Sequence, residues 1–271
     1  ALPTQGANAD NLHARAFFVR SGGGLALATK TSPSSKPNMR IRVVEPLSLL
    51  KAHIQKIEGV IITNDDPDLI VTKDGNATVL ALPNMHPLCR FTSFDIHQVV
   101  DRIRRHLRIQ PLINLVYPRQ QFNVEIELSG SYPKSIIAED ETFKFEIRTE
   151  KPAYLLLIDV DPSGAVHVLH PFDKSELQPL APGEKRVLTG KCLAIWPFGT
   201  ETVKLFAFTH KPQALESFVG KEDIHPDSLL FKNLERLVGV RGLKSSRAAI
   251  RTDAAQAALN ITSYPKTNMR R

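Results

Sequence analysis

Strict alternation of apolar and polar residues in the second half of the chain is the feature that most restricts its fold. It occurs in residues 122–128 (FNVEIEL) and 143–148 (FKFEIR). Successive side chains of a β-strand point to opposite faces, so each segment is expected to bury one face and to expose the other. Further apolar segments, separated by turns rich in Pro and Gly, are also expected to be strands: 153–160, 165–169, 186–188, 192–196 and 203–208.

These short and closely spaced strands predict an antiparallel β-sandwich over residues 119–262, either immunoglobulin-like or jelly-roll-like. A helix is expected near 227–237 and a last short strand at 257–262. Residues 263–271 form a basic tail. The second half is therefore expected to be a β-rich domain with helical additions.

Residues 39–118 have a different pattern, which predicts a small α/β unit and makes the fold class α+β. The apolar residues Leu47, Leu50, Ile54 and Ile57 are spaced by three and four, which predicts a helix that opens at Pro46 and ends at Gly59. A second helix is expected over 93–109, capped by Thr92 or Ser93, with a buried face of Ile96, Val99, Val100, Ile103 and Leu107. The expected strands are 40–44, a buried strand at 60–63, and a hairpin of 69–72 with 77–82.

The remaining part, residues 1–38, is rich in Gly, Ser and Pro and is expected to be a flexible arm. The chain has 271 residues, of which 42% are hydrophobic and 23% charged, and this is the profile of a soluble folded protein. No apolar run approaches the roughly 18 residues of a membrane-spanning helix, and the first residues have no signal-peptide pattern. The compartment, cytoplasmic or periplasmic, the oligomeric state and the sequence upstream of Ala1 stay open.

Two groups of charged residues are candidate binding sites. The formal net charge is +7, and part of it lies on the exposed side of the second predicted helix, at Arg102, Arg105 and Arg108 with Arg104 nearby. This face is suited to phosphates or to an acidic patch on a neighbouring domain. Nucleic acid is not the expected partner, because no aromatic residues are interleaved and no known motif is present. Asp65, Asp66 and Asp68 form an acidic cluster that could bind a cation or a basic peptide, although a solvated turn is the simpler interpretation.

Asp159 and Asp161 are weak candidates for a metal site. With Ser163 and Gly164 they match the beginning of a calcium loop, but the acid that such a loop needs at its twelfth position is replaced by His170. Asp-Pro-Ser-Gly between two apolar runs is a good hairpin turn in its own right, and this interpretation is favoured. His167 and His170 fall on opposite faces of the predicted strand, which does not suit a zinc pair. No metal and no cofactor is expected.

The two cysteines, Cys89 and Cys192, are expected to be buried or half-buried thiols, and whether they are bonded stays open. His86 and Cys89 could be imagined as a base and a nucleophile. Catalytic Cys–His pairs are neighbours in space rather than in sequence, and they need a third group that orients the base. An enzyme of this kind is the weakest of the interpretations.

The segment from Lys151 to Lys211 resembles a known family. Its hairpin AYLLLIDVDPSGAVHVLHP, its Pro-Gly turn LAPGE and its strand GTETVKLFA are similar to the pattern of a bacterial domain of unknown function, family 4384. The resemblance extends more loosely over 120–262. Proteins of that family often carry a caspase-like cysteine peptidase domain ahead of this one, and residues 39–115 look similar to the stretch that joins the two. The His-Gly and Asp-x-Cys-x-Ser-Gly elements of the peptidase are absent from this sequence.

The resemblance implies a non-catalytic regulatory or interaction module, the C-terminal portion of a caspase-like peptidase, with a protein partner such as the catalytic domain itself. The alternative is a stand-alone secreted or periplasmic β-sandwich binding protein. A cross-link between Cys89 and Cys192 would favour that alternative, because disulfides persist in oxidising compartments.

Overall fold

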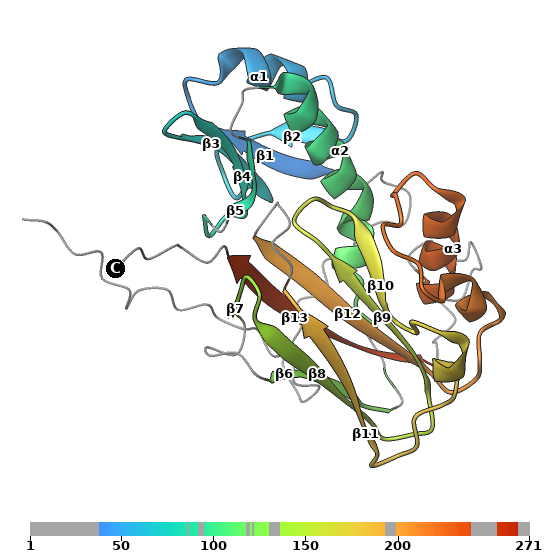
Figure 1. Ribbon diagram of the computed structural model, residues 1–271. Coiled ribbons are helices and arrows are strands. Elements are labelled where there is room, and N and C mark those ends of the chain that lie inside the picture. The colour runs from blue at the N-terminus through green and yellow to red at the C-terminus, as the bar shows by residue number, and fades with distance from the viewer. Residues whose placement is uncertain are drawn as a thin grey trace, which may run out of the picture.

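The computed structural model describes residues 38–85, 87–91, 95–117, 120, 122–129, 136–192, 199–239 and 254–264. The expected arm therefore lies outside the described residues, except for Asn38, and so does most of the basic tail. No helix in the described ranges is long and apolar enough to cross a membrane. Figure 1 shows a smaller α/β unit next to a larger body of β-strands.

The α/β unit contains a five-stranded sheet with the order β2-β1-β3-β4-β5. Strand β1 is parallel to both β2 and β3, whereas β3, β4 and β5 are antiparallel. The strands are β1 (Met39–Val43), β2 (Val60–Ile62), β3 (Leu69–Asp74), β4 (Ala77–Ala81) and β5 (Pro87–Phe91). Two helices, α1 (Ser48–Ile54) and α2 (Ile96–Ile113), share a buried apolar core with this sheet. The expected α/β unit is thus present, with β5 as a strand that the sequence pattern did not predict.

Two details of this unit differ from the expectation. The segment predicted as a buried strand, β2, is an edge strand, and its Ile61 is 47% exposed. An all-apolar run predicts burial on both faces, but α1 packs beside this edge and covers only part of it. Helix α1 begins at Ser48, with Leu47 at the N-cap, so Pro46 lies in the preceding turn rather than in the first helical turn.

Helix α2 begins after Asp95, whose carboxylate accepts hydrogen bonds from the backbone N–H groups of His97 and Gln98. The predicted caps, Thr92 and Ser93, lie outside the described residues. The helix continues to Ile113 although Pro111 lies inside it. Its last turn is stabilised by packing, because Leu112 is completely buried in the core of the neighbouring β-rich body.

The predicted sandwich is present as two sheets. The larger has the order β10-β9-β12-β13-β7 and the smaller has the order β11-β8-β6. Their strands are β6 (Val124–Ser129), β7 (Ile136–Ala138), β8 (Thr142–Thr149), β9 (Tyr154–Val160), β10 (Val166–His170), β11 (Lys185–Lys191), β12 (Thr200–Phe208) and β13 (Ala254–Tyr264). The pairing is antiparallel except for β13 and β7, which are parallel. Between the sheets lies one apolar core, built from alternate residues of β6, β8, β9 and β12.

Strand β13 is longer and more central than the short final strand that the sequence predicted. It pairs with β12 along nine residues, from Ala254 opposite Phe208 to Thr262 opposite Thr200. Its alternation is weak because Ala occupies positions on both faces, so the pairing with β12 decides its extent. Most of the predicted strand 192–196 lies outside the described residues.

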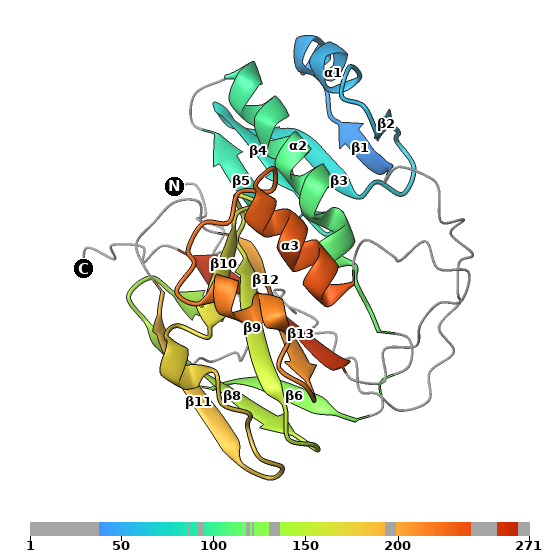
Figure 2. The same ribbon diagram turned by 90° about the vertical axis from the view of Figure 1, so that its right-hand side faces the viewer.

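Helical segments cover the outer face of the larger sheet, as Figure 2 shows. They are the short helix η3 (Gln213–Phe218), the helix α3 (Leu229–Val238) and the C-terminal half of α2, whereas the short helix η2 (Lys174–Glu176) has no buried residue. Ser228 caps α3 by accepting a hydrogen bond from the backbone N–H of Phe231. A second apolar core lies between η3, α3, α2 and the sheet.

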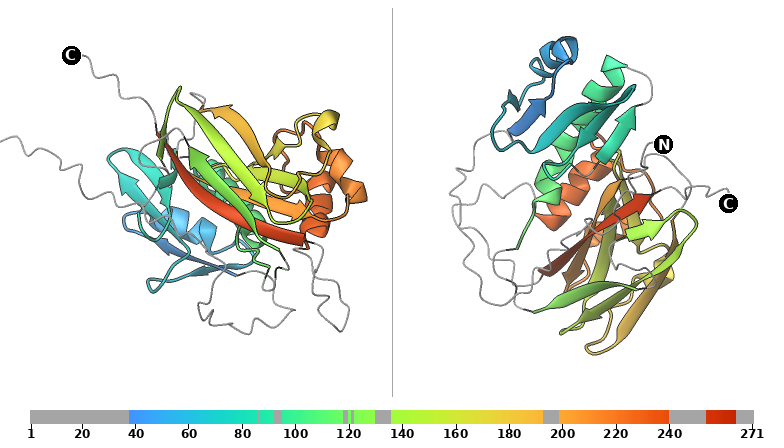
Figure 3. Two further views of the ribbon diagram at one scale, coloured as in Figure 1. Left: turned by 90° about the horizontal axis from the view of Figure 1, so that it is seen from below. Right: turned by 90° about the vertical axis from the view of Figure 1, so that its left-hand side faces the viewer.

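Helix α2 belongs to both bodies. Ile103 on its N-terminal half is buried in the core of the α/β unit, whereas Ile109 and Leu112 are buried in the second core of the sandwich. Figure 3 (right) shows the helix passing from one body to the other. The two units therefore share a structural element rather than being joined by a linker alone.

Candidate functional site

Buried ionisable residues gather where α2 meets the turn between β9 and β10, residues 161–165, and we call this contact the junction. The side chain of Arg102 donates a hydrogen bond to the carbonyl oxygen of Ser163. His106 Nε2 lies 3.3 Å from the carbonyl oxygen of Pro162. Two side chains of α2 thus bind two successive backbone carbonyls of the turn.

Glycines allow the close approach at the junction. Gly164 has a φ of +79°, and a Cβ there would lie 3.2 Å from the Cβ of Arg105. At Gly199, just before β12, a Cβ would lie 2.6 Å from the carbonyl oxygen of Pro87 on β5. A larger residue at either position would push the α/β unit away from the sandwich.

Asp161 holds the turn together. Its Oδ1 accepts a hydrogen bond from the backbone N–H of Ala165 at 2.9 Å, and its Oδ2 lies 3.3 Å from Nε2 of His167. Nδ1 of His167 accepts from the backbone N–H of Asp223, so the proton of the neutral imidazole lies on Nε2 and is donated to Asp161. Burial raises the pKa of Asp161, but the hydrogen bonds from His167, Ser163 and Ala165 outweigh it and lower the pKa overall. The hydrogen bond to Asp161 raises the pKa of His167, against the effect of burial.

Two further carboxyl groups lie behind the turn, on the face of the larger sheet that is turned to the sandwich core. Asp159 is directly opposite His167 on β10 and opposite Val203 on β12. Glu201 lies two residues before Val203 and so on the same face, where its Oε1 accepts a hydrogen bond from Ser263 Oγ at 2.9 Å. We call Asp159, Asp161 and Glu201 the carboxyl cluster.

Asp159 is 8% exposed, and its Oδ1 is buried without a hydrogen-bond partner among the described residues. Burial, followed by the charges of Glu201 and Asp161, raises the pKa of Asp159 well above its usual range. Burial also raises the pKa of Glu201, and Asp161 adds to this, although the hydrogen bond from Ser263 opposes it. The cluster therefore favours protonated carboxyl groups behind an ionised Asp161.

The structure uses the two metal candidates for different purposes. Asp161 stabilises the hairpin turn, as the turn interpretation predicts, whereas Asp159 faces the interior of the sandwich. Within the described ranges, no three Asp, Glu, His or Cys side chains are arranged to hold a metal ion. His167 and His170 do not share a site, because His167 contacts Asp161 and His170 lies 3.0 Å from Glu176.

The three candidate arginines contact groups of this chain. Arg102 binds the turn, as described above, and Arg105 forms an ion pair with Asp101 at 3.0 Å. Arg108 lies 4.0 Å from both Asp227 and Glu235, which belong to the segment around α3. Only Arg108 of the three thus faces acidic groups of the neighbouring domain, whereas Arg102 contacts a backbone carbonyl there and Arg105 pairs within its own helix. Arg104 is exposed.

The acidic cluster at residues 65–68 surrounds an arginine of β1. Arg40 donates to Asp66 Oδ2 at 2.7 Å and to the backbone carbonyl of Asp65 at 2.5 Å. The backbone N–H of Arg40 donates to Asp68 Oδ2 at 2.7 Å. These contacts close the loop after β2 onto the sheet, and they agree with the interpretation as a turn.

Both cysteines are free thiols. Burial raises the pKa of Cys89, and the nearby charge of Arg102 opposes it. Burial, followed by the charges of Glu201 and other acidic groups, raises the pKa of Cys192 to about 11. Both are therefore protonated at neutral pH, whereas a thiolate is the nucleophilic form. His86, the imagined base, lies outside the described residues.

Three buried polar residues were not predicted as important. Burial lowers the pKa of His106 to about 4, so its imidazole is neutral. Burial also lowers the pKa of Lys204 to about 8, and its Nζ donates to the carbonyl oxygen of Leu115 at 2.6 Å, just beyond α2. His170 is buried next to Glu176. His106 could have been found from its spacing, since it lies three residues after Ile103 and three before Ile109 on the buried stripe of the helix.

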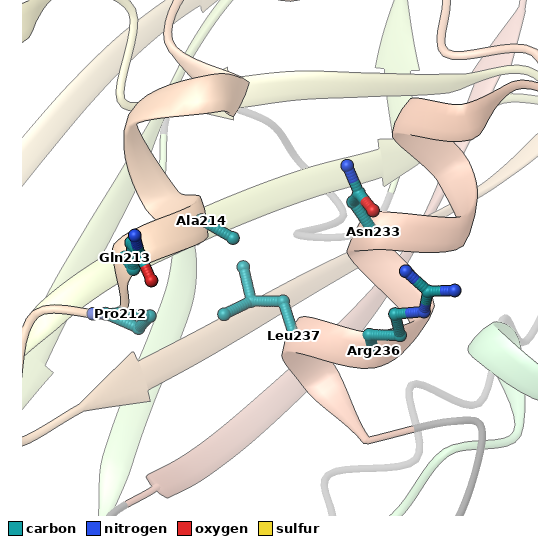
Figure 4. A pocket seen from close by; sticks show the side chains of 6 residues that line it. All are labelled: Pro212, Gln213, Ala214, Asn233, Arg236 and Leu237. Carbon is teal, nitrogen blue, oxygen red and sulfur yellow. The ribbon is translucent and has the colours of Figure 1, made fainter.

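A shallow hollow of about 430 Å³ lies between η3 and α3 (Figure 4). It is lined by Pro212, Gln213, Ala214, Asn233, Arg236 and Leu237. The figure shows the side chains of Arg236 and Asn233 on one wall and those of the η3 segment on the other. Its lining contains no pair of groups that could act together as acid and base.

Comparison with known proteins adds no functional residues to this description. No family model matches the chain, and no curated protein matches it significantly. The features that the geometry itself brings together are the junction with its carboxyl cluster and two protonated thiols.

Proposed function

We propose that this chain is a non-catalytic regulatory or interaction module and forms the C-terminal portion of a protein with a caspase-like cysteine peptidase unit. The resemblance of residues 151–211 to family 4384 supplies the peptidase context. The state of the thiols supports a non-catalytic role, because neither Cys89 nor Cys192 has the lowered pKa of a nucleophile.

The observation that carries the interaction role is the edge strand β11. It pairs with β8 along all seven of its residues, and its other side pairs with no strand among the residues that the structure describes. Its alternate residues are exposed, including Val187 at 42%. An edge strand of this length offers backbone donors and acceptors to an extended segment of a partner, which adds to the sheet as a further strand.

The ends of β11 carry lysines, which proteins also use to protect an edge against aggregation. Here both lysines are neutralised by the chain itself, since Lys185 lies 3.1 Å from Glu146 and Lys191 lies 2.8 Å from Asp140. The two ends of β11 therefore carry little unbalanced charge, whereas Arg186 lies between them.

The peptidase context is tested by determining the N-terminal sequence and the intact mass of the protein in its native cells, together with the reading frame upstream of Ala1. We expect a precursor that encodes a His–Cys peptidase unit ahead of this chain. A reading frame with no peptidase upstream would overturn the proposal.

The interaction role is tested separately by mixing the purified chain with the upstream unit and measuring their binding by calorimetry. We expect Val187→Asp to weaken binding about tenfold or more, because it places a charge on the edge that the partner strand covers. The matched control is Leu229→Asp, since Leu229 is also an exposed apolar residue but lies on α3. Equal affinities of the two variants and of the wild type would exclude β11 as the binding edge.

A further inference from the structure

The junction depends on the backbone conformation of the β9–β10 turn, because Arg102 and His106 of α2 bind backbone carbonyls of the turn rather than side chains. Pro162 and Ser163 supply these carbonyls. The turn is shaped by Asp161, which binds the backbone of Ala165 through its side chain, and by a backbone hydrogen bond from Gly164 N–H to the carbonyl of Asp161. A displacement of the Asp161 carboxylate would therefore also displace the turn carbonyls that α2 binds.

The strongest interaction that could displace this carboxylate is charge repulsion from the other two carboxyl groups of the cluster, Asp159 and Glu201. Asp159 is buried opposite His167 on β10, and Glu201 of the neighbouring strand β12 lies diagonally from Asp159 on the same face. Three carboxylates cannot all be ionised in this environment without strong repulsion, since one buried oxygen of Asp159 has no donor among the described residues.

Other charged or titratable groups surround the cluster from each neighbouring element. His167 and Asp223 face it from β10 and from the segment before α3. Arg102 and His106 face it from α2, and Cys89 lies on β5 within the electrostatic reach of Asp161. Among these groups Arg102 carries a permanent positive charge, and it lies on the side of Asp161. None of these groups compensates a charge on Asp159 directly.

We propose that a proton held by the Asp159–Glu201 pair keeps the β9–β10 turn in the shape that receives α2, so that the junction opens when this proton is lost in alkaline solution. The α/β unit and the sandwich would then separate at one end of α2 while its other end remains in the sandwich core. This regulatory device goes beyond the proposed function and does not depend on it.

The direction of the pH effect follows from the shifts. Asp159 and Glu201 have raised pKa values, so their contribution to stability is present below the pKa of the unfolded chain and is lost as the pH rises through the folded pKa. The pKa of His167 is also raised, so its favourable charge next to Asp161 is lost in the same direction. Asp161 has a lowered pKa and His106 a pKa of about 4, so both act only on the acid side.

Cys89 provides a probe of the opening, because it is buried on β5 within the electrostatic reach of Arg102 and Asp161 at the junction. In the full chain with Cys192→Ser, the labelling rate of Cys89 by a maleimide is measured by intact mass from pH 6 to 9, for the Asp159 chain and for Asp159→Asn. The amide cannot ionise, and the thiol chemistry is otherwise the same. We expect the ratio of the two rates to grow by up to about tenfold per pH unit as the pH rises towards the folded pKa of the cluster, and to level off above it, where the closed junction is ionised as well.

Glu201→Gln serves as a second variant if Asp159→Asn fails to fold, and it is expected to flatten the pH profile in the same way. Glu127→Gln on β6 is the control, because Glu127 is exposed and remote from the cluster in the pairing of the strands. A ratio that stays constant across the pH range for both cluster variants would overturn the proposal.

Discussion

Two acidic clusters of this chain have opposite electrostatic characters. The cluster at Asp65, Asp66 and Asp68 lies in an exposed loop around Arg40, which forms an ion pair with Asp66, and Asp66 is 90% exposed. The cluster of Asp159, Asp161 and Glu201 is buried behind a turn, and only Asp161 has hydrogen-bond donors that favour its ionised form. The comparison shows that burial and the number of hydrogen-bond donors, rather than the number of acidic residues, decide whether the carboxyl groups of such a cluster favour the ionised or the protonated form.

The largest expected effect is at Asp161. Replacing it by Ala removes the groups that bind Ala165 and His167 and deforms the turn that receives α2. We expect a loss of about 4 kcal/mol in the free energy of unfolding, because each of the two lost hydrogen bonds to the charged carboxylate contributes about 1.5–3 kcal/mol. Chemical denaturation monitored by circular dichroism measures it. A loss below about 1 kcal/mol would mean that the buried cluster behaves like the exposed one.

The stability of the fold in acidic solution is expected to depend on His106 at the junction. Its folded pKa is lowered to about 4, so the stability that it contributes as a neutral group is complete above its usual pKa and is lost as the pH falls from about 6.5 to about 4. The free energy of unfolding should fall by about 3 kcal/mol more over this range in the wild type than in His106→Gln. Parallel pH profiles of the two chains would contradict this assignment.

An added methyl group at the junction should have an intermediate effect. Gly164→Ala places a Cβ at a φ of +79° and 3.2 Å from the Cβ of Arg105. The expected loss is about 2 kcal/mol, because the left-handed conformation alone costs about 1–2 kcal/mol for a residue with a Cβ. Gly75→Ala is the matched control, since Gly75 also has a positive φ but no atom lies near its Cβ position. Equal losses in both variants would show that the backbone, and not the contact with α2, sets the cost.

The smallest effect is expected in the exposed cluster. Asp66→Ala breaks the ion pair with Arg40, but both side chains are in contact with water. We expect a change below about 1 kcal/mol in the free energy of unfolding, and a smaller one at high salt concentration. A change as large as that of Asp161→Ala would remove the contrast between the clusters.

The sequence by itself determined the two-unit α+β organisation, because hydrophobic periodicity is a local property. The alternation in β6 and β8, the hairpin of β9 and β10, and the buried stripes of α1 and α2 were all predicted from spacing. The turn at residues 161–164 was likewise correct, since Asp, Pro and Gly fix its geometry locally.

Only the tertiary structure decided which residues meet. The edge position of β2 and the length of β13 depend on strand pairing, and the last turn of α2 depends on packing against the sandwich. In the carboxyl cluster, Glu201 lies near Asp159 and Asp161 although about 40 residues of sequence separate them, so no local motif predicts the cluster. The charge states of Asp159, His106 and Lys204 follow from burial, which is a property of the folded molecule and not of the sequence pattern.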